Sequence, residues 1–190
     1  HALGQVANFK TNSQIPIEKF AIAINSRLKK SIVIKKAEEV DERFHSRLNC
    51  KRKTYRYIIN NSPYGTAIYR YLETHIPQKL NVEKMKKAVK YFIGEHDFKA
   101  FKASGTSSKS SVRTIYDAKI YQNGDKIYIE LTGNGFLYNM VRIIAGTLVE
   151  VGLEKIEPEK IEEIIKEGKR ENAGKTLPPN GLYLVDVKYE

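Results

Sequence analysis

The 190-residue sequence contains no tryptophan, two methionines and a single cysteine, Cys50. One cysteine cannot form a disulfide within the chain, which suits a reducing compartment and predicts a cytoplasmic location. Four scattered histidines give no recognisable spacing of metal ligands, so we expect no metal and no cofactor held by such a cluster. No segment approaches the roughly 18 consecutive apolar residues of a membrane span, so no membrane association is expected.

Acidic residues are few relative to basic ones. The 33 Lys and Arg residues against 22 Asp and Glu give a formal net charge of +11. Such an excess is typical of proteins with a polyanionic partner, because neutralised phosphates release counterions. A well-solvated, lysine-rich surface has the same composition. Charge alone therefore leaves a nucleic acid partner and an ordinary basic surface equally open.

Hydrophobic periodicity predicts strands and helices in mixed order. Asn81 is suited to begin a helix, and Asn123-Gly124 between two alternating runs predicts a tight type I′ hairpin turn. The expected strands are 4–10, 32–40, 53–60, the two hairpin arms and 182–189, and the expected helices are 17–28, one after Asn81, GFLYNMVRIIAGTLVEVG, and one from Pro158 to Gly168. This order predicts an α+β fold with helices on one face of a mostly antiparallel sheet.

The stretch FHSRLNCKRKTYRYII combines cations with aromatic rings. Tyr55 and Tyr57 are expected on one face of a strand, and the basic residues beside them include Arg47, Lys51 and Arg52. Cations neutralise phosphates and rings stack on unpaired bases, so the pattern suits RNA. An ordinary core strand with buried tyrosine rings is consistent with the same sequence.

Arg142 interrupts an otherwise apolar helix. At 100° per residue it shares a face with Asn139 and Gly146. A guanidinium left unpaired in a core is costly, so Arg142 either reaches water or meets an acidic group in a cleft. The helix alone does not decide between these two interpretations.

Two other stretches carry weaker signals. GEHDFKAF contains His96-Asp97 but lacks the further ligands of a metallohydrolase, and is expected to be a turn with Phe98 and Phe101 packed inward. SGTSSKSS lacks the spacing of a phosphate-binding loop, although a basic loop touching RNA phosphate remains open.

Taken together, the sequence resembles the tRNA pseudouridine synthase A family from His1 to the C-terminus. The resemblance is carried, in this order, by HALGQVANF, FHSRLNCKRKTYRYII, GEHDFKAF, VRTI, GNGFLYNMVRIIAGTLVEVG and PPNGLYLVDVKY. It implies isomerisation of uridine to pseudouridine in the anticodon stem-loop of tRNA, without cofactor or metal. The target base then has to leave the stack, at a cost of a few kcal/mol.

The resemblance also implies roles for individual residues. Tyr55 matches the tyrosine that stacks on the target base, and Arg142 matches the basic residue that pairs with the catalytic aspartate. That aspartate belongs to the motif G-R-T-D-x-G-V-H-A-x-G-Q-V and is expected immediately upstream of His1, so residues 1–190 are expected to be inactive alone and Arg142 to be unpaired or held by water. Substrate contacts are expected at the remaining site residues, which are Arg47, Lys51, Arg52, Leu137 and Tyr138.

The family fold has two ferredoxin-like lobes that share one sheet, and its members are homodimers. The resemblance therefore predicts a remnant of the N-terminal lobe at residues 1–42 and the C-terminal lobe at residues 43–190. The competing hypothesis is a non-catalytic RNA-binding module. It predicts an aromatic signature of the form K/R-G-F/Y-G/A-F-V-x-F/Y, which the sequence does not contain.

Overall fold

The computed structural model describes residues 1–105 and 110–189. The suggestion that SGTSSKSS contacts phosphate falls largely on residues 106–109, outside the described part. Two compact units are present: one comprises residues 1–5 and 50–190, and the other residues 6–49. The expected lobe boundary at residue 42 stays a prediction.

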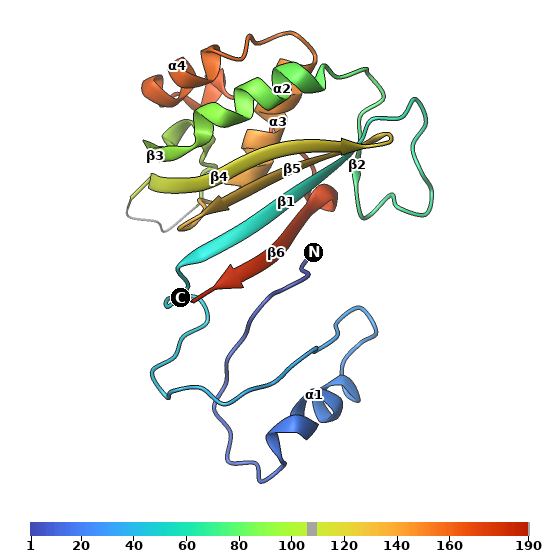
Figure 1. The fold of residues 1–190 in the computed structure, drawn as a ribbon, viewed down its shortest axis with the longest axis vertical. Coiled ribbons are helices and arrows are strands. Elements are labelled where there is room, and N and C mark those ends of the chain that lie inside the picture. Colours follow the sequence, from blue (N-terminus) through green and yellow to red (C-terminus); the bar gives the residue numbers. More distant parts are fainter. Residues whose placement is uncertain (106–109, 190) are drawn as a thin grey trace. The chain divides into compact units, whose positions relative to one another are not determined.

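Six strands in the described residues of the larger unit form one mixed sheet (Figure 1). Strand β1 lies inside the sheet: β5 pairs with one edge, and β6 and the short β2 pair with the other. All pairs are antiparallel except β1–β2. The strands are β1 (Arg52–Asn60), β2 (Thr74–His75), β3 (Gly94–Asp97), β4 (Val112–Asn123), β5 (Lys126–Gly133) and β6 (Leu182–Lys188).

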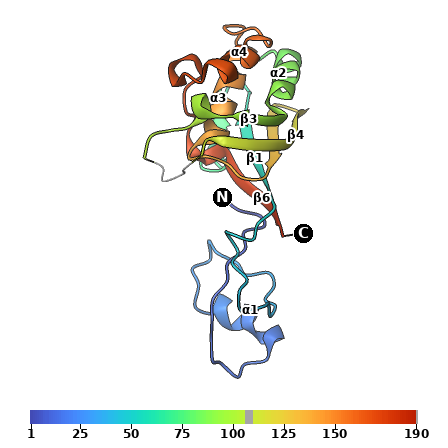
Figure 2. The same cartoon turned by 90° about the vertical axis from the view of Figure 1, so that its left-hand side faces the viewer.

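Three helices cover one face of this sheet: α2 (Val82–Val89), α3 (Met140–Gly152) and α4 (Lys160–Glu167) (Figures 1 and 2). Their apolar sides and the facing strand residues form one core, in which α3 is buried along most of its length. The predicted α+β fold is confirmed. No helix of the described chain has the length and apolarity needed to cross a bilayer.

Several local signals in the sequence are confirmed. The Asn81 side chain accepts a hydrogen bond from the Lys84 backbone N–H at 3.1 Å and begins α2. Gly168 ends α4 in the left-handed conformation, with φ of 65°. Phe98 and Phe101 are fully buried, although His96-Asp97 forms the end of strand β3 rather than a turn.

The predicted hairpin forms, but its turn lies one residue later. Asn123 pairs with Lys126, so the two turn residues are Gly124 and Asp125. Gly124 has φ of 57°, and Asp125 is not among the described non-glycine residues with positive φ. A positive φ at the first turn residue alone is the pattern of a type II′ turn, which favours glycine there. The type I′ assignment was wrong.

The smaller unit contains helix α1 (Ile17–Asn25), close to the predicted 17–28. The Asn25 side chain exchanges two hydrogen bonds with the Ile34 backbone, at 2.9 and 2.7 Å. The strands predicted at 4–10 and 32–40 do not form: neither segment pairs with another strand in the described residues, and the Ile34 backbone bonds to the Asn25 side chain instead.

The first residues of the chain lie along β6, in the larger unit. Ala2 forms a parallel bridge with Leu184, the Leu3 N–H donates to the Leu184 carbonyl at 2.8 Å, and the Leu184 N–H donates to the His1 carbonyl at 2.9 Å. The HALGQVANF motif thus begins beside the C-terminal strand.

Candidate active site

Tyr55 and Tyr57 project from the helix-covered face of β1, as the alternating pattern predicts. Two residues along a strand span about 7 Å, so the rings are neighbours. The half-buried Tyr55 ring contacts the edge of Phe136, with centroids 5.1 Å apart and planes at 82°. Burial, assisted by the nearby Cys50, raises the pKa of Tyr55. Phe136 is a neighbour that the sequence analysis did not select.

Arg142 lies in the first turn of α3 and is half-buried. Its Nε donates to the Leu177 carbonyl at 2.6 Å and one terminal nitrogen donates to Asn139 Oδ1 at 2.8 Å. Arg142 makes no ion pair among the described residues, and two neutral protein oxygens hold its guanidinium. Together the two bonds fix the plane of the guanidinium. Its second terminal nitrogen takes part in neither of them.

Asn139 adopts the left-handed conformation, with φ of 60°, directly before α3. Asparagine tolerates this conformation better than most residues. The bend explains why α3 begins at Met140, later than the apolar run suggests. It also places the Asn139 carboxamide beside Arg142, three residues on.

The 173–177 segment crosses α3 at very short range. An ideal Cβ on Gly146 would lie 1.8 Å from the Lys175 carbonyl oxygen, and one on Gly174 would lie 2.6 Å from the Gly146 carbonyl carbon. The Gly174 N–H donates to Thr147 Oγ1 at 2.9 Å, and the Leu177 N–H donates to the Arg142 carbonyl at 3.3 Å. Two glycines therefore allow the approach that brings Leu177 to Arg142.

Tyr57 connects β1 to Pro178, the residue that follows the 173–177 segment. Its phenol donates to the Pro178 carbonyl at 2.6 Å, and since a phenol has one proton, Thr74 Oγ1 donates to it at 2.6 Å. Burial raises the pKa of Tyr57 to about 12, while the Thr74 bond and the Arg142 charge act in the opposite direction. The site thus combines a neutral, buried phenol with an oriented guanidinium.

Replacing Tyr57 with phenylalanine is expected to lower the free energy of unfolding by about 1–2 kcal/mol near neutral pH, because Thr74 and Pro178 lose a buried partner. The folded-state pKa of about 12 exceeds the ordinary 10.0. Neutral Tyr57 therefore stabilises the fold fully below about pH 10, and this stabilisation is lost as the pH rises toward 12. Urea titrations of both proteins at about pH 8 and pH 11 measure the effect. A stability difference that does not shrink at the higher pH would contradict this assignment.

The other predicted site residues lie in different surroundings. Leu137 is buried in the core, whereas the Tyr138 side chain is 56% exposed. Lys51 and Arg52 are exposed where β1 begins, and the Arg52 guanidinium lies 4.8 Å from the centroid of the Tyr116 ring. Arg47 is exposed and belongs to the smaller unit. Among the described residues, no hydrogen bond or ion pair joins these five side chains to Arg142.

Neither a ligand pocket nor a metal centre stands out in the described residues. No three or more of their His, Cys, Asp and Glu side chains gather as metal ligands would. A shallow, open hollow of about 420 Å3 lies where β1 ends, and its lining residues are Asn60, Ser62, Thr66, Asn123, Asp125, Lys126 and Tyr128. These residues are distinct from the Tyr55, Tyr57 and Arg142 group.

Comparison with known proteins relates the sequence of this chain to one family. A family model described as tRNA pseudouridine synthase matches residues 88–190, the part that contains α3 and β6. The chain is 52% identical over 189 residues to tRNA pseudouridine synthase A of Acetivibrio thermocellus, with 100% of this chain and 78% of the relative covered. It is 53% identical to the protein of that name from Thermoanaerobacter pseudethanolicus and 54% identical to that from Ruminiclostridium cellulolyticum, with the same coverage. The chain belongs to the tRNA pseudouridine synthase A family.

Proposed function

We propose that this protein isomerises uridine to pseudouridine in the anticodon stem-loop of tRNA. The bond between N1 of uracil and C1′ of ribose breaks, the uracil turns, and C5 bonds to C1′. The proton on C5 is then lost and N1 gains one, so the product is an isomer of the substrate.

One observation carries the proposal: a half-buried arginine is held in a defined orientation by Leu177 and Asn139, beside the tyrosine face of β1. A guanidinium fixed by two neutral oxygens keeps its positive charge available to a carboxylate. In our proposal Arg142 pairs with the catalytic aspartate of the family motif, and Tyr55 stacks on the uracil that has left the helix.

The position of the first residues supports this arrangement. The His1 backbone nitrogen donates to the Leu182 carbonyl at 2.9 Å, five residues along the chain from Leu177, which binds Arg142. In our proposal a carboxylate just upstream of His1 reaches the guanidinium. Accordingly we propose that residues 1–190 alone bind tRNA without converting it.

The test compares the gene product, expressed from its own start codon, with residues 1–190. Tritium release from an unmodified tRNA transcript labelled at C5 of uridine measures conversion, and filter binding at two salt concentrations measures affinity. We expect both proteins to bind tRNA less tightly at the higher salt concentration. We expect only the gene product to release tritium.

Each other outcome is informative. Conversion by residues 1–190 would mean that a carboxylate within them performs the chemistry. Binding without conversion by the whole gene product would favour the non-catalytic RNA-binding module, and absence of binding by both would overturn the proposed function. The homodimer and the cytoplasmic location implied by the resemblance stay predictions, and sedimentation of the gene product tests the first.

A further inference from the structure

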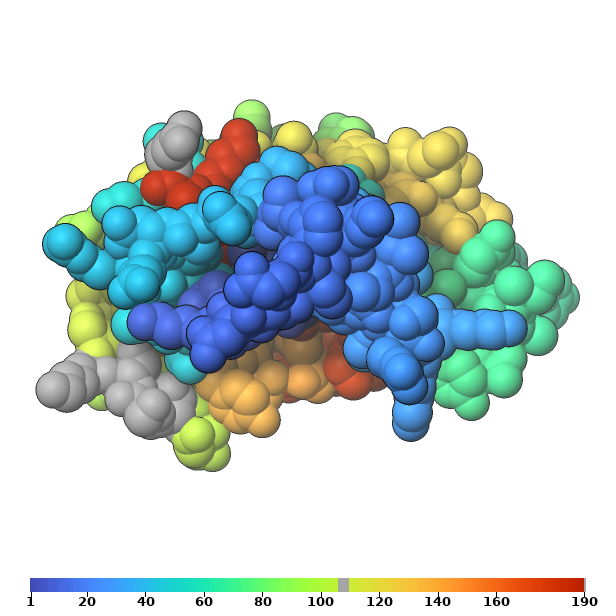
Figure 3. Space-filling model, turned by 90° about the horizontal axis from the view of Figure 1, so that it is seen from below, coloured from blue at the N-terminus to red at the C-terminus, as the bar shows by residue number. Residues whose placement is uncertain are grey.

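The 61–72 loop, which joins β1 to β2, carries an unusual concentration of exposed apolar side chains. Tyr64 is 85% exposed, Ile68 82% and Tyr71 64%. Single exposed apolar residues are normal, but a cluster on one short segment marks an interaction surface. The loop stands out from the edge of the larger unit in Figure 1 and forms the green projection at the right of Figure 3.

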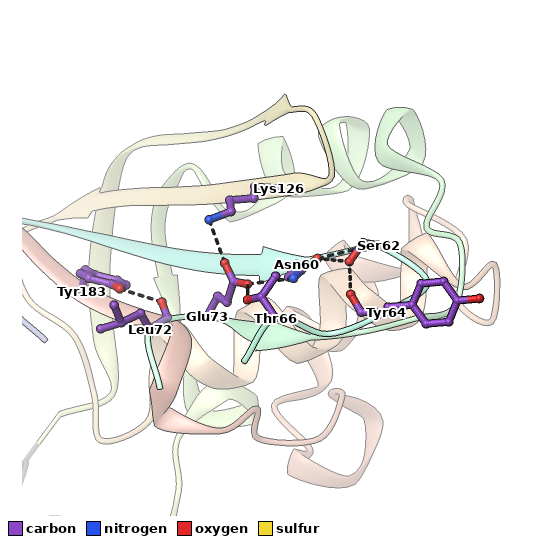
Figure 4. A network of polar contacts seen from close by, with 8 residues as sticks. All are labelled: Asn60, Ser62, Tyr64, Thr66, Leu72, Glu73, Lys126 and Tyr183. Carbon is purple, nitrogen blue, oxygen red and sulfur yellow. Dashed lines mark hydrogen bonds and ion pairs between the residues drawn. The ribbon is translucent and has the colours of Figure 1, made fainter. Parts of the chain in front are cut away.

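The first half of the loop is anchored on a buried carboxylate, that of Glu73 (Figure 4). Glu73 accepts hydrogen bonds from Asn60 and Thr66, each at 2.8 Å, and pairs with Lys126 at 3.0 Å. Burial alone would raise the pKa of Glu73, but these three partners outweigh it and the pKa is lowered. Tyr64, in contrast, points away from this network.

The second half of the loop is held by its backbone. The Asn180 side chain donates to the Arg70 carbonyl at 2.9 Å, the His1 ring nitrogen lies 2.7 Å from the Tyr71 carbonyl, and the Tyr183 hydroxyl donates to the Leu72 carbonyl at 2.6 Å. Three successive carbonyls are thus engaged by the body of the unit. The exposed side chains sit on a backbone that is already ordered, so binding through them costs little additional conformational entropy.

The charge of the loop favours an anionic partner. Arg70 is its one charged residue, and residues 61–72 contain no Asp or Glu. The Arg70 guanidinium lies 4.4 Å from the centroid of the Tyr71 ring. A cation next to exposed tyrosine rings is the combination that binds single-stranded or splayed nucleotides, because rings stack on bases and the cation pairs with phosphate.

The loop is also tied to the candidate active site through one short segment. Within 177–180, the Leu177 carbonyl binds Arg142, the Pro178 carbonyl binds Tyr57, and Asn180 binds the loop. The backbone of 177–180 therefore positions both the Arg142 guanidinium and the 61–72 loop.

We propose that the 61–72 loop is an RNA-binding surface that stacks unpaired nucleotides of the substrate on Tyr64 and Tyr71 and binds an adjoining phosphate through Arg70. This inference rests on the proposed function, since it takes RNA to be the substrate. It adds a contact region outside the Tyr55 and Arg142 site.

The test uses the whole gene product and an unmodified tRNA transcript. The Tyr64→Ala/Tyr71→Ala variant is expected to bind tRNA about tenfold or more weakly, from the ~1–3 kcal/mol that stacking contributes per base. Tyr64→Phe/Tyr71→Phe keeps both rings and is the matched control, expected to bind within about twofold of the unchanged protein. Arg70→Ala removes one expected phosphate contact, so the slope of log affinity against log salt concentration is expected to become shallower by about one.

The outcomes separate this inference from the proposed function. If the unchanged protein neither binds nor converts tRNA, the proposed function fails. If it does both and the alanine variant binds equally well, only the loop inference is overturned. Sedimentation of the same variants tests whether the loop binds a second copy of the chain instead of RNA. A loss of self-association with unchanged tRNA affinity would assign the loop to that contact and would also overturn the inference.

Discussion

Replacing Arg142 with lysine is expected to lower kcat/KM for pseudouridine formation by at least about 100-fold in the whole gene product. Lysine keeps the positive charge, but its ammonium group is a compact point charge without the planar geometry of a guanidinium. It therefore cannot bind the Leu177 carbonyl and a carboxylate together in one fixed orientation. Breaking a charge pair that is buried costs about 3–5 kcal/mol, and the lower end of this range suits the half-buried Arg142 and its proposed aspartate partner, since each 1.36 kcal/mol corresponds to a factor of ten. Single-turnover conversion of the tRNA transcript measures the loss, while filter binding is expected to change only a few-fold.

A second variant separates orientation from charge. Asn139→Gly keeps the positive φ at this position and removes the oxygen that orients Arg142. We expect it to lower the single-turnover rate by at least about tenfold, from the ~1.5–3 kcal/mol assigned to hydrogen bonds with charged groups. If Arg142→Lys keeps kcat/KM within threefold of the unchanged protein, Arg142 is not part of the catalytic machinery.

The second large effect is on stability. Gly146→Ala is expected to lower the free energy of unfolding by about 3 kcal/mol, because its Cβ would lie 1.8 Å from the Lys175 carbonyl oxygen, which belongs to backbone and cannot rotate away. Either α3 or the 173–177 segment has to shift. Since Leu177 ends that segment and binds Arg142, activity is expected to fall with stability.

Urea unfolding measures this destabilisation, and Gly135→Ala is the matched control. A Cβ on Gly135 would lie 3.5 Å from Arg113 Nε, an ordinary contact, and Gly135 does not have a positive φ. We expect the control to change stability by no more than about 0.5 kcal/mol. Equal unfolding midpoints for Gly146→Ala and the unchanged protein would show that the close crossing is not rigid.

The sequence predicted those parts of the molecule that local patterns determine. Strand β1, the Asn81 cap and the Gly168 helix end depend on a few adjacent residues, and all three are present. The strands predicted at 4–10 and 32–40 failed because a strand needs a partner, and periodicity does not identify one. Likewise, the pattern of α3 exposed Arg142 as anomalous but gave no sign of Leu177, whose carbonyl lies 35 residues further along the chain.

Asn139 and Phe136 show a further limit of prediction. The left-handed turn at Asn139 depends on a single φ, and an apolar run gives no signal for it. Phe136 had no feature to distinguish it from its neighbours Leu137 and Tyr138, yet its ring contacts Tyr55. Both were within the quoted motif, so the sequence located the region of the site but not its contacts.

The pairing of His1–Leu3 with β6 has a consequence for biosynthesis. The His1 backbone nitrogen and the Leu182 carbonyl that accepts its hydrogen bond are 181 residues apart. At a synthesis rate of about 5–20 residues per second, the partner strand β6 is made about 10–40 s after the HALGQVANF motif. The motif therefore reaches its position only after β6 has been translated, and a nascent chain that stops before β6 cannot assemble the site.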